Sequence, residues 1–253
     1  MKSLVVLGGT GYLGRHIVRN AVEASWKVTT ISTKGVNDLG LSGVEHHKGN
    51  VFQPESYTGV LENADAVVHS MGIIMENPVY KDVINGNMSL CDVVKGPNPM
   101  EKQGAHNNNT FERLNRDSAI ILAKEFAKYQ QQDSRKPFVF ISAEDWNPLA
   151  SRKYIATKRE AEAILERDYS EKLRPVFVRP GFMYEDNNPT SLRNQLGTMA
   201  NLFGMLGSRF HHSITNPALS VDIVAKAVVE SLQDDSIEGV VNLDALQEYA
   251  KAA

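Results

Sequence analysis

The chain has 253 residues, with 27 lysines and arginines against 30 aspartates and glutamates, so its formal net charge is −3 at pH 7. The hydrophobic fraction of 42% and the single cysteine, Cys91, exclude a disordered chain and a disulfide scaffold. The length indicates one large globular domain, or one domain with a small appendage. The balanced charge, without a run of like charges, argues against nucleic-acid binding.

Short β-rich runs alternate with helical patterns in the first part of the chain. The predicted elements are a strand over 3–7, a helix over 12–25, strands over 28–31 and 44–48, a short helix over 54–61 and a strand over 66–69. This alternation is typical of βαβ units, so we expect a doubly wound parallel α/β sheet. Residues 71–110 show no period and are expected to form a partly mobile loop of the kind that is often functional.

The regular pattern returns after residue 110. The predicted elements are a helix over 111–131, a strand over 138–141, a helix over 151–169, a strand over 176–178, a short apolar helix within 181–220, a helix over 221–232 and a strand over 240–243. The sheet is therefore expected to have at least six strands. Ligands of such sheets lie beyond the carboxyl ends of the strands.

Three glycines at three-residue intervals join the first strand to the first helix. Gly8 permits a tight turn, Gly11 lets the backbone approach a pyrophosphate, and Gly14 lets the helix pack closely on the strand. Free N–H groups at the helix start would face the phosphates. The strand and the helix together favour dinucleotide binding over a plain glycine turn. The residues expected to contact the cofactor here are Gly8, Thr10, Gly11, Tyr12, Leu13 and Gly14.

This motif defines the expected organisation of the chain. Residues 1–180 are expected to be a dinucleotide-binding Rossmann core. Residues 181–253 are expected to be a small C-terminal lobe for substrate or partner, with a returning helix and strand, integrated with the core into a single domain.

The end of the second predicted strand bears on the choice of cofactor. It carries Ser32 and Lys34 instead of the acidic residue that would bind the ribose 2′-hydroxyl of NAD. A hydroxyl and a cation suit a 2′-phosphate, and Arg15 can add a second charge. We therefore expect NADP(H) in preference to NAD(H), the alternative being that Lys34 is merely solvated. Asn50, after the third strand, is expected either to meet the adenine edge or to be a turn residue.

A tyrosine and a lysine lie four residues apart on one face of a predicted helix, at Tyr154 and Lys158. The ordinary pKa of tyrosine is about 10, and a neighbouring cation favours the phenolate. The pair can therefore act as a general acid and base beside a nicotinamide. The helix follows the strand that ends near Ser142 and precedes Arg179, Pro180 and Gly181, which is where such a pair would meet the cofactor.

Together these residues resemble the extended and atypical short-chain dehydrogenase/reductase superfamily over nearly the whole chain. The matching positions are Gly8, Gly11, Gly14, residues 65–72, Asn115, Tyr154, Lys158, residues 179–181, Val221 and Asp222. The resemblance implies a catalytic set of Tyr154, Lys158 and Ser142. It also implies further cofactor contacts from Ser70, Met71, Gly72, Lys158, Pro180, Gly181, Phe182 and Met183.

The chain departs from the superfamily at the serine that usually binds the substrate. Glu144 stands at the usual place of this serine, just beyond Ser142. A carboxylate donates a hydrogen bond only when it is protonated, so ordinary carbonyl reduction is disfavoured unless Ser142 substitutes in a rearranged loop. Asn115 is followed by Arg116 where the family often has a glycine, so we also expect different helix packing there.

Within the superfamily, residues 141–144 and 179–184 are similar to fungal mitochondrial proteins associated with coenzyme Q biosynthesis. Those proteins are similar in turn to the NADPH-binding accessory subunit of respiratory complex I. The resemblance implies an NADP(H)-binding accessory factor of ubiquinone biosynthesis, peripheral on the matrix side of the mitochondrial inner membrane, with a protein complex as partner. The alternative is an active NADPH-dependent oxidoreductase acting on a quinone precursor or another carbonyl or hydroxyl substrate through Tyr154 and Lys158.

Other features lead to weaker expectations. The pairs His46–His47 and His211–His212 place neighbours on opposite faces of a strand, so we expect no metal site. The apolar residues within 196–210 have helical spacing, which predicts core packing, the alternative being a surface for a membrane, a partner or a polyisoprenoid tail. The stretch is too short to span a bilayer. Residues 4–7 run directly into glycines, so no cleavable signal is expected there.

Overall fold

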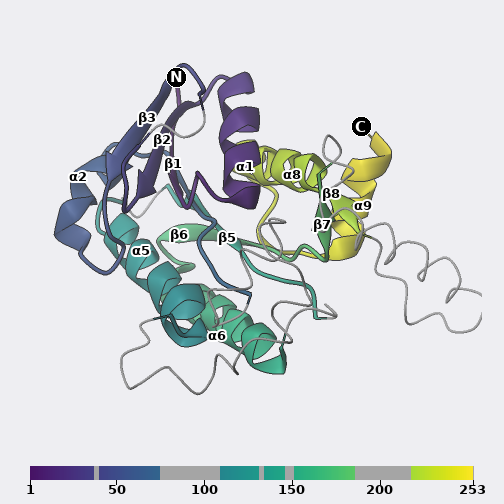
Figure 1. The fold of residues 1–253 in the computed structure, drawn as a ribbon. Coiled ribbons are helices and arrows are strands. Elements are labelled where there is room, and N and C mark those ends of the chain that lie inside the picture. The colour runs from purple at the N-terminus through teal and green to yellow at the C-terminus, as the bar shows by residue number, and fades with distance from the viewer. Residues whose placement is uncertain (37–39, 75–108, 131–133, 146–150, 186–217, 253) are drawn as a thin grey trace, which may run out of the picture.

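The computed structural model describes residues 1–36, 40–74, 109–130, 134–145, 151–185 and 218–252 (Figure 1). Within these residues, seven parallel strands form one sheet. In spatial order they are β3 (Val44–Lys48), β2 (Lys27–Ser32), β1 (Ser3–Leu7), β4 (Ala66–His69), β5 (Lys136–Ile141), β6 (Leu173–Val178) and β9 (Gly239–Val241). The prediction of a doubly wound parallel sheet is confirmed.

Helices cover both faces of the sheet (Figure 1). On one face lie α1 (Tyr12–Glu23) and α8 (Val221–Gln233), with α9 (Leu243–Ala252) beside α8. On the other lie the short α2 (Thr58–Leu61), α5 (Ser118–Ala127) and α6 (Arg152–Tyr169). Because both faces are buried, the central strands are continuously apolar instead of alternating.

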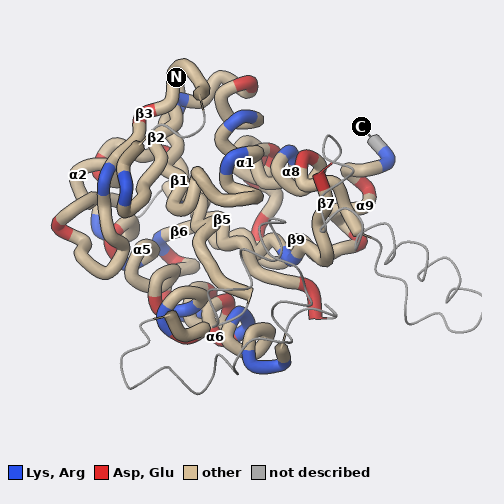
Figure 2. Tube along the Cα trace, viewed as in Figure 1, with Lys and Arg blue, Asp and Glu red and all other residues tan. Residues whose placement is uncertain are grey.

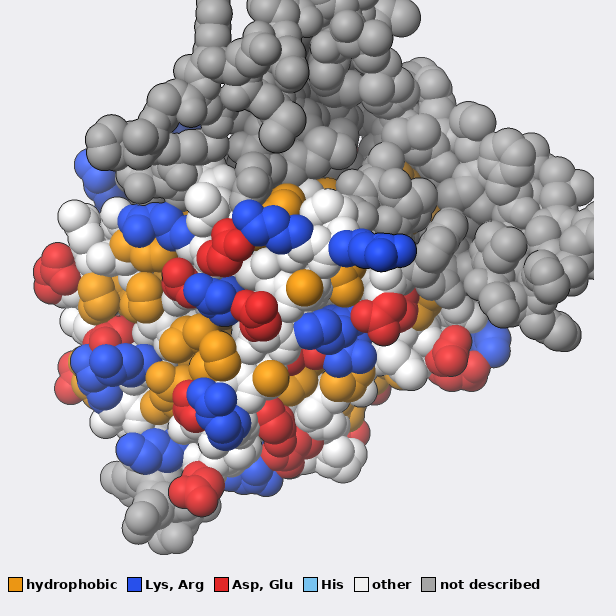
Figure 3. All heavy atoms as spheres, turned by 90° about the horizontal axis from the view of Figure 1, so that it is seen from below, with side chains coloured by type: hydrophobic (Ala, Val, Ile, Leu, Met, Phe, Trp, Pro, Cys, Tyr) orange, Lys and Arg blue, Asp and Glu red, His pale blue; other side chains and the backbone are white. Residues whose placement is uncertain are grey.

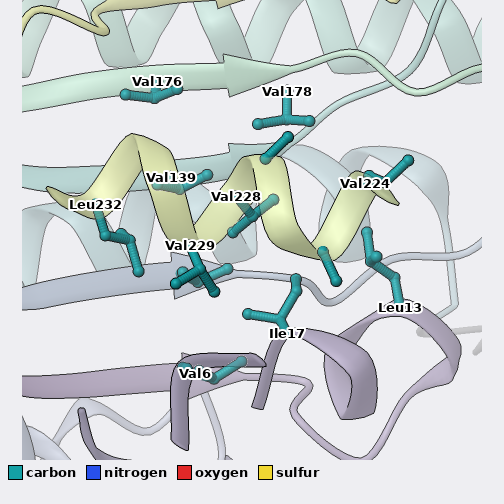
Figure 4. Close-up of a cluster of buried hydrophobic side chains, with 14 of the residues drawn as sticks. Val6, Leu13, Ile17, Val139, Val176, Val178, Val224, Val228, Val229 and Leu232 are labelled. Atoms are coloured by element: carbon teal, nitrogen blue, oxygen red, sulfur yellow. The ribbon is translucent and has the colours of Figure 1, made fainter. Parts of the chain in front are cut away.

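The packing between α1, α8 and the sheet is drawn in Figure 4. Val6 and Val139 of the sheet face Ile17 of α1 and Val228 of α8, and all four side chains are inaccessible to solvent. Burial of such side chains stabilises the fold by about 1.5–3 kcal/mol each. The packing joins α8, from the last third of the chain, to the first helix.

The strand order reverses at β1, which has β2 on one side and β4 on the other. At such a switch point the loops after neighbouring strands diverge and leave a crevice at the carboxyl ends. A separate pair of parallel strands, β7 (Met183–Tyr184) and β8 (Leu219–Ser220), follows β6 in the chain. Here the Leu219 N–H donates to the Phe182 carbonyl at 2.9 Å.

The helix predicted over 111–131 is wrong in detail. A π-helical turn, η3 (Glu112–Asp117), comes first, and the α-helical part is α5. Asn115 lies in this turn, and both polar atoms of its side chain bond to the backbone of Ile73. The short helix expected over 54–61 is divided into η1 (Pro54–Ser56) and α2.

The strand predicted over 240–243 is present as β9, but its predicted end is wrong, because β9 ends at Val241 and α9 follows. The cause is Asn242, whose Oδ1 accepts a hydrogen bond from the Ala245 N–H at 3.0 Å and caps the new helix. The predictions for most of 71–110, for the apolar residues within 196–210 and for His211–His212 fall largely or wholly outside the described residues.

Charged side chains of both signs are interspersed along the described chain (Figure 2). The face shown in Figure 3 carries basic and acidic side chains close together, with hydrophobic ones between them. On this face the described residues therefore create no extended field of one sign. None of the helices that the structure describes is both long enough and apolar enough to cross a membrane.

Candidate functional site

The turn between β1 and α1 is built around glycine. Gly8 has φ +82°, a left-handed conformation that side chains rarely adopt, and its carbonyl accepts a hydrogen bond from the Gly11 N–H at 2.9 Å. A Cβ at Gly14 would lie 2.1 Å from the Gly8 oxygen, so the helix approaches the turn more closely than any other residue would allow. These contacts are what the Gly8–Gly11–Gly14 spacing predicts.

The N-cap residue of helix α1 is Gly11, which has no side chain that could cap the helix, and the first turn of the helix has no acidic residue. The N-terminal end of a helix carries a partial positive charge and unpaired N–H groups. A glycine turn in front of a helix start suits the diphosphate of a dinucleotide. The cofactor contacts expected from Thr10, Tyr12 and Leu13 stay predictions.

The end of β2 lies beside this turn, and β3 lies on the far side of β2. Ser32 Oγ accepts a hydrogen bond from the Gly35 N–H at 2.9 Å, and the Lys34 side chain is exposed. Asn50 Oδ1 accepts from the Phe52 N–H at 3.1 Å, which makes Asn50 a turn residue. Its contact with adenine stays a prediction, as does recognition of a 2′-phosphate by Ser32 and Lys34.

Arg15 points to a different partner than expected from the sequence. Its Nη2 lies 3.0 Å from Oε1 of Glu185, which follows β7. Glu185 is also 3.2 Å from Nε2 of His16, and the other ring nitrogen of His16 is 2.6 Å from Asp222 of α8. This network, which the sequence analysis missed, ties α1 to the β7 segment and to the Val221–Asp222 motif.

The segment after β4 lies directly beside the glycine turn. The Ser70 N–H donates to the Leu7 carbonyl at 2.9 Å, and a Cβ at Gly8 would lie 2.9 Å from the Ser70 carbonyl carbon. Met71 and Gly72 continue from this point toward Asn115. The structure thus brings together two of the segments that were predicted to bind the cofactor.

Helix α6 presents the tyrosine and the lysine on one buried face. Ser151 caps the helix by accepting a hydrogen bond from the Tyr154 N–H at 3.1 Å. The Tyr154 ring packs edge-on against Phe111, with 5.8 Å between the ring centres. The Lys158 Nζ donates to the Ile141 carbonyl at 2.7 Å, and Gly72 lies beside this ammonium.

Burial strongly perturbs Lys158, which is 3% exposed. Removal of the ammonium from water lowers the pKa of Lys158 to about 7, although the Glu162 carboxylate acts in the opposite direction. A lysine whose pKa is shifted to near neutrality is typical of a functional site. This group is therefore well suited to hold or to move a proton.

Ser142 is buried, but its Oγ accepts a hydrogen bond from Arg159 Nη1 at 3.1 Å. Arg159 also bonds to Glu162, which in turn accepts from Arg179 Nε at 3.1 Å. Sequence reasoning missed both Arg159 and Glu162. The signal was present, since Glu162 lies one turn beyond Lys158 on the same face of α6.

The segment after β6 lies beside the loop that follows β5. The Glu144 N–H donates to the Pro180 carbonyl at 3.0 Å, which joins the loop after β5 to the loop after β6. Pro180 and Gly181 are buried, whereas Phe182 and Met183 are half-buried. Their predicted cofactor contacts stay predictions. Among the described residues no group of three or more potential ligands could hold a metal ion.

A cavity of about 370 Å³ lies elsewhere, at the amino ends of β1, β2 and β3 and beside α2. Its polar groups largely bond to protein atoms: Lys27 pairs with Glu45 at 2.9 Å, and His47 Nε2 lies 2.7 Å from the Ser56 carbonyl oxygen. The cavity is at the opposite end of the strands from the glycine turn.

Comparison with known proteins agrees with this geometry. The chain is 33% identical over 272 residues to MIOREX complex component 2 of Saccharomyces cerevisiae, and the match covers 95% of this chain and 97% of that protein. Its fold is similar to that of BdcA in complex with NADPH, at 15% identity and a TM-score of 0.63, covering 95% of this chain and 92% of the other.

The fold is also similar to that of Thermus thermophilus UDP-glucose 4-epimerase in complex with NAD, at 16% identity and a TM-score of 0.57, covering 99% of this chain and 83% of the other. A family model described as NAD(P)H-binding matches residues 8–235, which begin at the first glycine of the turn. The chain therefore belongs to the NAD(P)H-binding family and has the fold of the short-chain dehydrogenases/reductases.

Proposed function

We propose that the protein is an NADP(H)-binding accessory factor of coenzyme Q biosynthesis, located on the matrix side of the mitochondrial inner membrane. The observation that carries the nucleotide part is the glycine turn before α1, in which Gly8 has a positive φ and Gly14 packs against the Gly8 oxygen more closely than a side chain would allow. The location and the pathway rest on the resemblance of residues 141–144 and 179–184 to fungal coenzyme Q proteins. The yeast relative is named as a component of a complex, which favours a partner complex here.

The contacts of Ser142, the predicted catalytic serine, favour an accessory role over an enzymatic one. Ser142 is engaged by Arg159, and Glu144 stands where the superfamily places its substrate-binding hydroxyl. A nucleotide that binds only the folded form stabilises it by about 2.7 kcal/mol at a hundredfold excess over its dissociation constant. A stabilisation of this size is sufficient for bound NADP(H) to maintain the folded surface that a partner protein binds, without any hydride transfer.

The preference for NADP(H) leads to a test at Lys34, whose exposed side chain follows β2. We expect Lys34→Glu to weaken NADPH binding about tenfold, because a carboxylate would repel the 2′-phosphate, and to leave NADH binding unchanged or tighter. Isothermal titration with both nucleotides measures the ratio. The exposed Lys124→Glu serves as the control, and equal losses for NADPH and NADH would contradict the assignment.

The second candidate is an NADPH-dependent oxidoreductase acting on a quinone precursor or another carbonyl or hydroxyl compound. It is favoured by Tyr154 and Lys158, which lie buried on one face of α6. When bound, the nicotinamide would supply or accept a hydride. Tyr154 would then supply or accept the proton at the substrate oxygen, with the Lys158 ammonium favouring the phenolate.

Replacement of Tyr154 by phenylalanine separates the two candidates. We expect Tyr154→Phe to restore function in cells that lack the protein, and to bind NADPH as tightly as the wild type, because the accessory role needs no proton transfer. Tyr169→Phe, at the far end of the same helix, is the matched control. Loss of both complementation and NADPH oxidation with quinone precursors in Tyr154→Phe alone would establish the oxidoreductase instead.

A further inference from the structure

We propose that His69 and Ser118 are positioning residues of the dinucleotide site, which act through the turn η3 to hold Asn115 against the segment that follows β4. The inference rests on the proposed nucleotide binding, because it assigns further residues to that same site. Neither residue is part of the predicted catalytic or cofactor-binding set. A series of buried and partly buried hydrogen bonds begins and ends next to the carboxyl end of β4.

The first link is Asn115, which is fully buried. Its Oδ1 accepts a hydrogen bond from the Ile73 N–H at 2.8 Å, and its Nδ2 donates to the Ile73 carbonyl at 2.9 Å. Both polar groups of one backbone residue are thus fixed by a single side chain. Ile73 directly follows Ser70, Met71 and Gly72, so this clamp sets the path of the predicted cofactor-binding segment.

The second link is Ser118, at the junction of η3 and α5. A π-helical turn is rare and often lies at a functional site. Ser118 Oγ donates to the Leu114 carbonyl at 2.8 Å, directly before Asn115. The hydroxyl has one proton, which this bond uses.

The third link is His69, the last residue of β4. Its Nε2 lies 2.8 Å from Ser118 Oγ. Because the serine proton already goes to Leu114, the histidine must be the donor, and His69 is therefore the tautomer with a proton on Nε2. Its Nδ1 is then a buried acceptor, with no hydrogen-bond partner among the described residues.

His69 has to be neutral for this arrangement. Burial, together with the nearby Lys158 ammonium, lowers the pKa of His69 to about 3. Phe140 separates the two groups: its ring centre is 5.5 Å from that of His69 and 4.4 Å from Lys158 Nζ. A neutral imidazole can donate to Ser118 without adding a second positive charge beside Lys158.

Three variants and a control test the series. Ser118→Ala removes the middle link. The side chain of His69→Asn is too short to reach Ser118 Oγ. The longer amide of His69→Gln has its nitrogen at a position similar to the imidazole Nε2 and can still donate to Ser118. Ser231→Ala is the matched control, because Ser231 is also buried and also donates to a carbonyl of its own helix, that of Val228, at 2.7 Å.

Two readouts are needed for each variant, at a temperature well below its melting transition. The first is the hydrogen-exchange rate of the Ile73 amide without nucleotide, which reports the Asn115 clamp directly. The second is the dissociation constant of NADPH. We expect Ser118→Ala and His69→Asn to raise both by about tenfold, His69→Gln to lie near the wild type, and Ser231→Ala to change neither.

Unchanged Ile73 exchange in Ser118→Ala and His69→Asn, even with lower melting temperatures, would overturn the proposal and make both ordinary packing residues. A proton on Nδ1 of His69 in the ¹⁵N spectrum of the wild type would overturn it as well. Failure of the wild type to bind NADPH would contradict the proposed function, whereas the Ile73 readout tests the positioning without any ligand.

Discussion

Replacement of Gly11 by valine is expected to weaken NADPH binding by about a hundredfold or more, equivalent to about 2.7 kcal/mol. Gly11 has φ −74° and ψ 176°, which valine adopts without strain. Apart from its chain neighbours, the only atom of the described residues within 4 Å of a Cβ there would be the Gly8 oxygen, at 3.1 Å. The new side chain would therefore occupy the space in front of α1 that the diphosphate needs.

The measurement is isothermal titration with NADPH, together with the melting temperature of the unliganded protein. We expect the melting temperature to stay within about 4 °C of the wild type, since only a small local adjustment is needed. Gly59→Val, at an exposed position with open space around it, controls for the substitution itself. Wild-type affinity in Gly11→Val would show that the diphosphate does not lie at this helix start.

The unliganded protein is expected to gain about 2 kcal/mol of unfolding free energy between pH 7 and pH 9 from Lys158 alone. Burial lowers the pKa of Lys158 from 10.5 to about 7 in the folded state. Between these values the unfolded chain binds more protons than the folded one. Stability from this group therefore rises with pH, because the cost of burying the ammonium disappears as it loses its proton.

Chemical denaturation at pH 7, 8 and 9 measures this slope. Lys158→Met keeps the length of the side chain and removes the charge, so we expect it to be more stable than the wild type at pH 7 and to have a flatter profile. Lys124→Met, on the exposed side of α5, should keep the wild-type slope. If the unfolding free energies of the wild type and of Lys158→Met changed in parallel with pH, the result would contradict a buried ammonium at Lys158.

Local sequence patterns were enough to predict the parts of the molecule that local chemistry determines. The glycine spacing follows from the turn that Gly8 and Gly14 must make, and the spacing of Tyr154 and Lys158 follows from the pitch of a helix. The apolar runs of β1, β4 and β5 predict buried parallel strands. The predicted bounds of β1 and β4 agree with the structure, and β5 contains the predicted range 138–141.

The rest depends on contacts between distant residues. Arg15 meets Glu185, and His16 meets Asp222, across most of the length of the chain. The hydrophobic periodicity of the sequence carries no signal for such long-range pairs. The π-helical turn around Asn115 is equally hidden, because it alters the helical pattern by a single residue. The start of α9 was recognisable in principle, since Asn242 is a typical capping residue.

A crystal structure of the protein with NADPH tests the central claim most directly. The diphosphate is expected against the backbone between Gly8 and Gly14, within hydrogen-bond distance of N–H groups at the start of α1. A structure at saturating NADPH in which this turn is filled by side chains, with the nucleotide bound elsewhere or not at all, would contradict it.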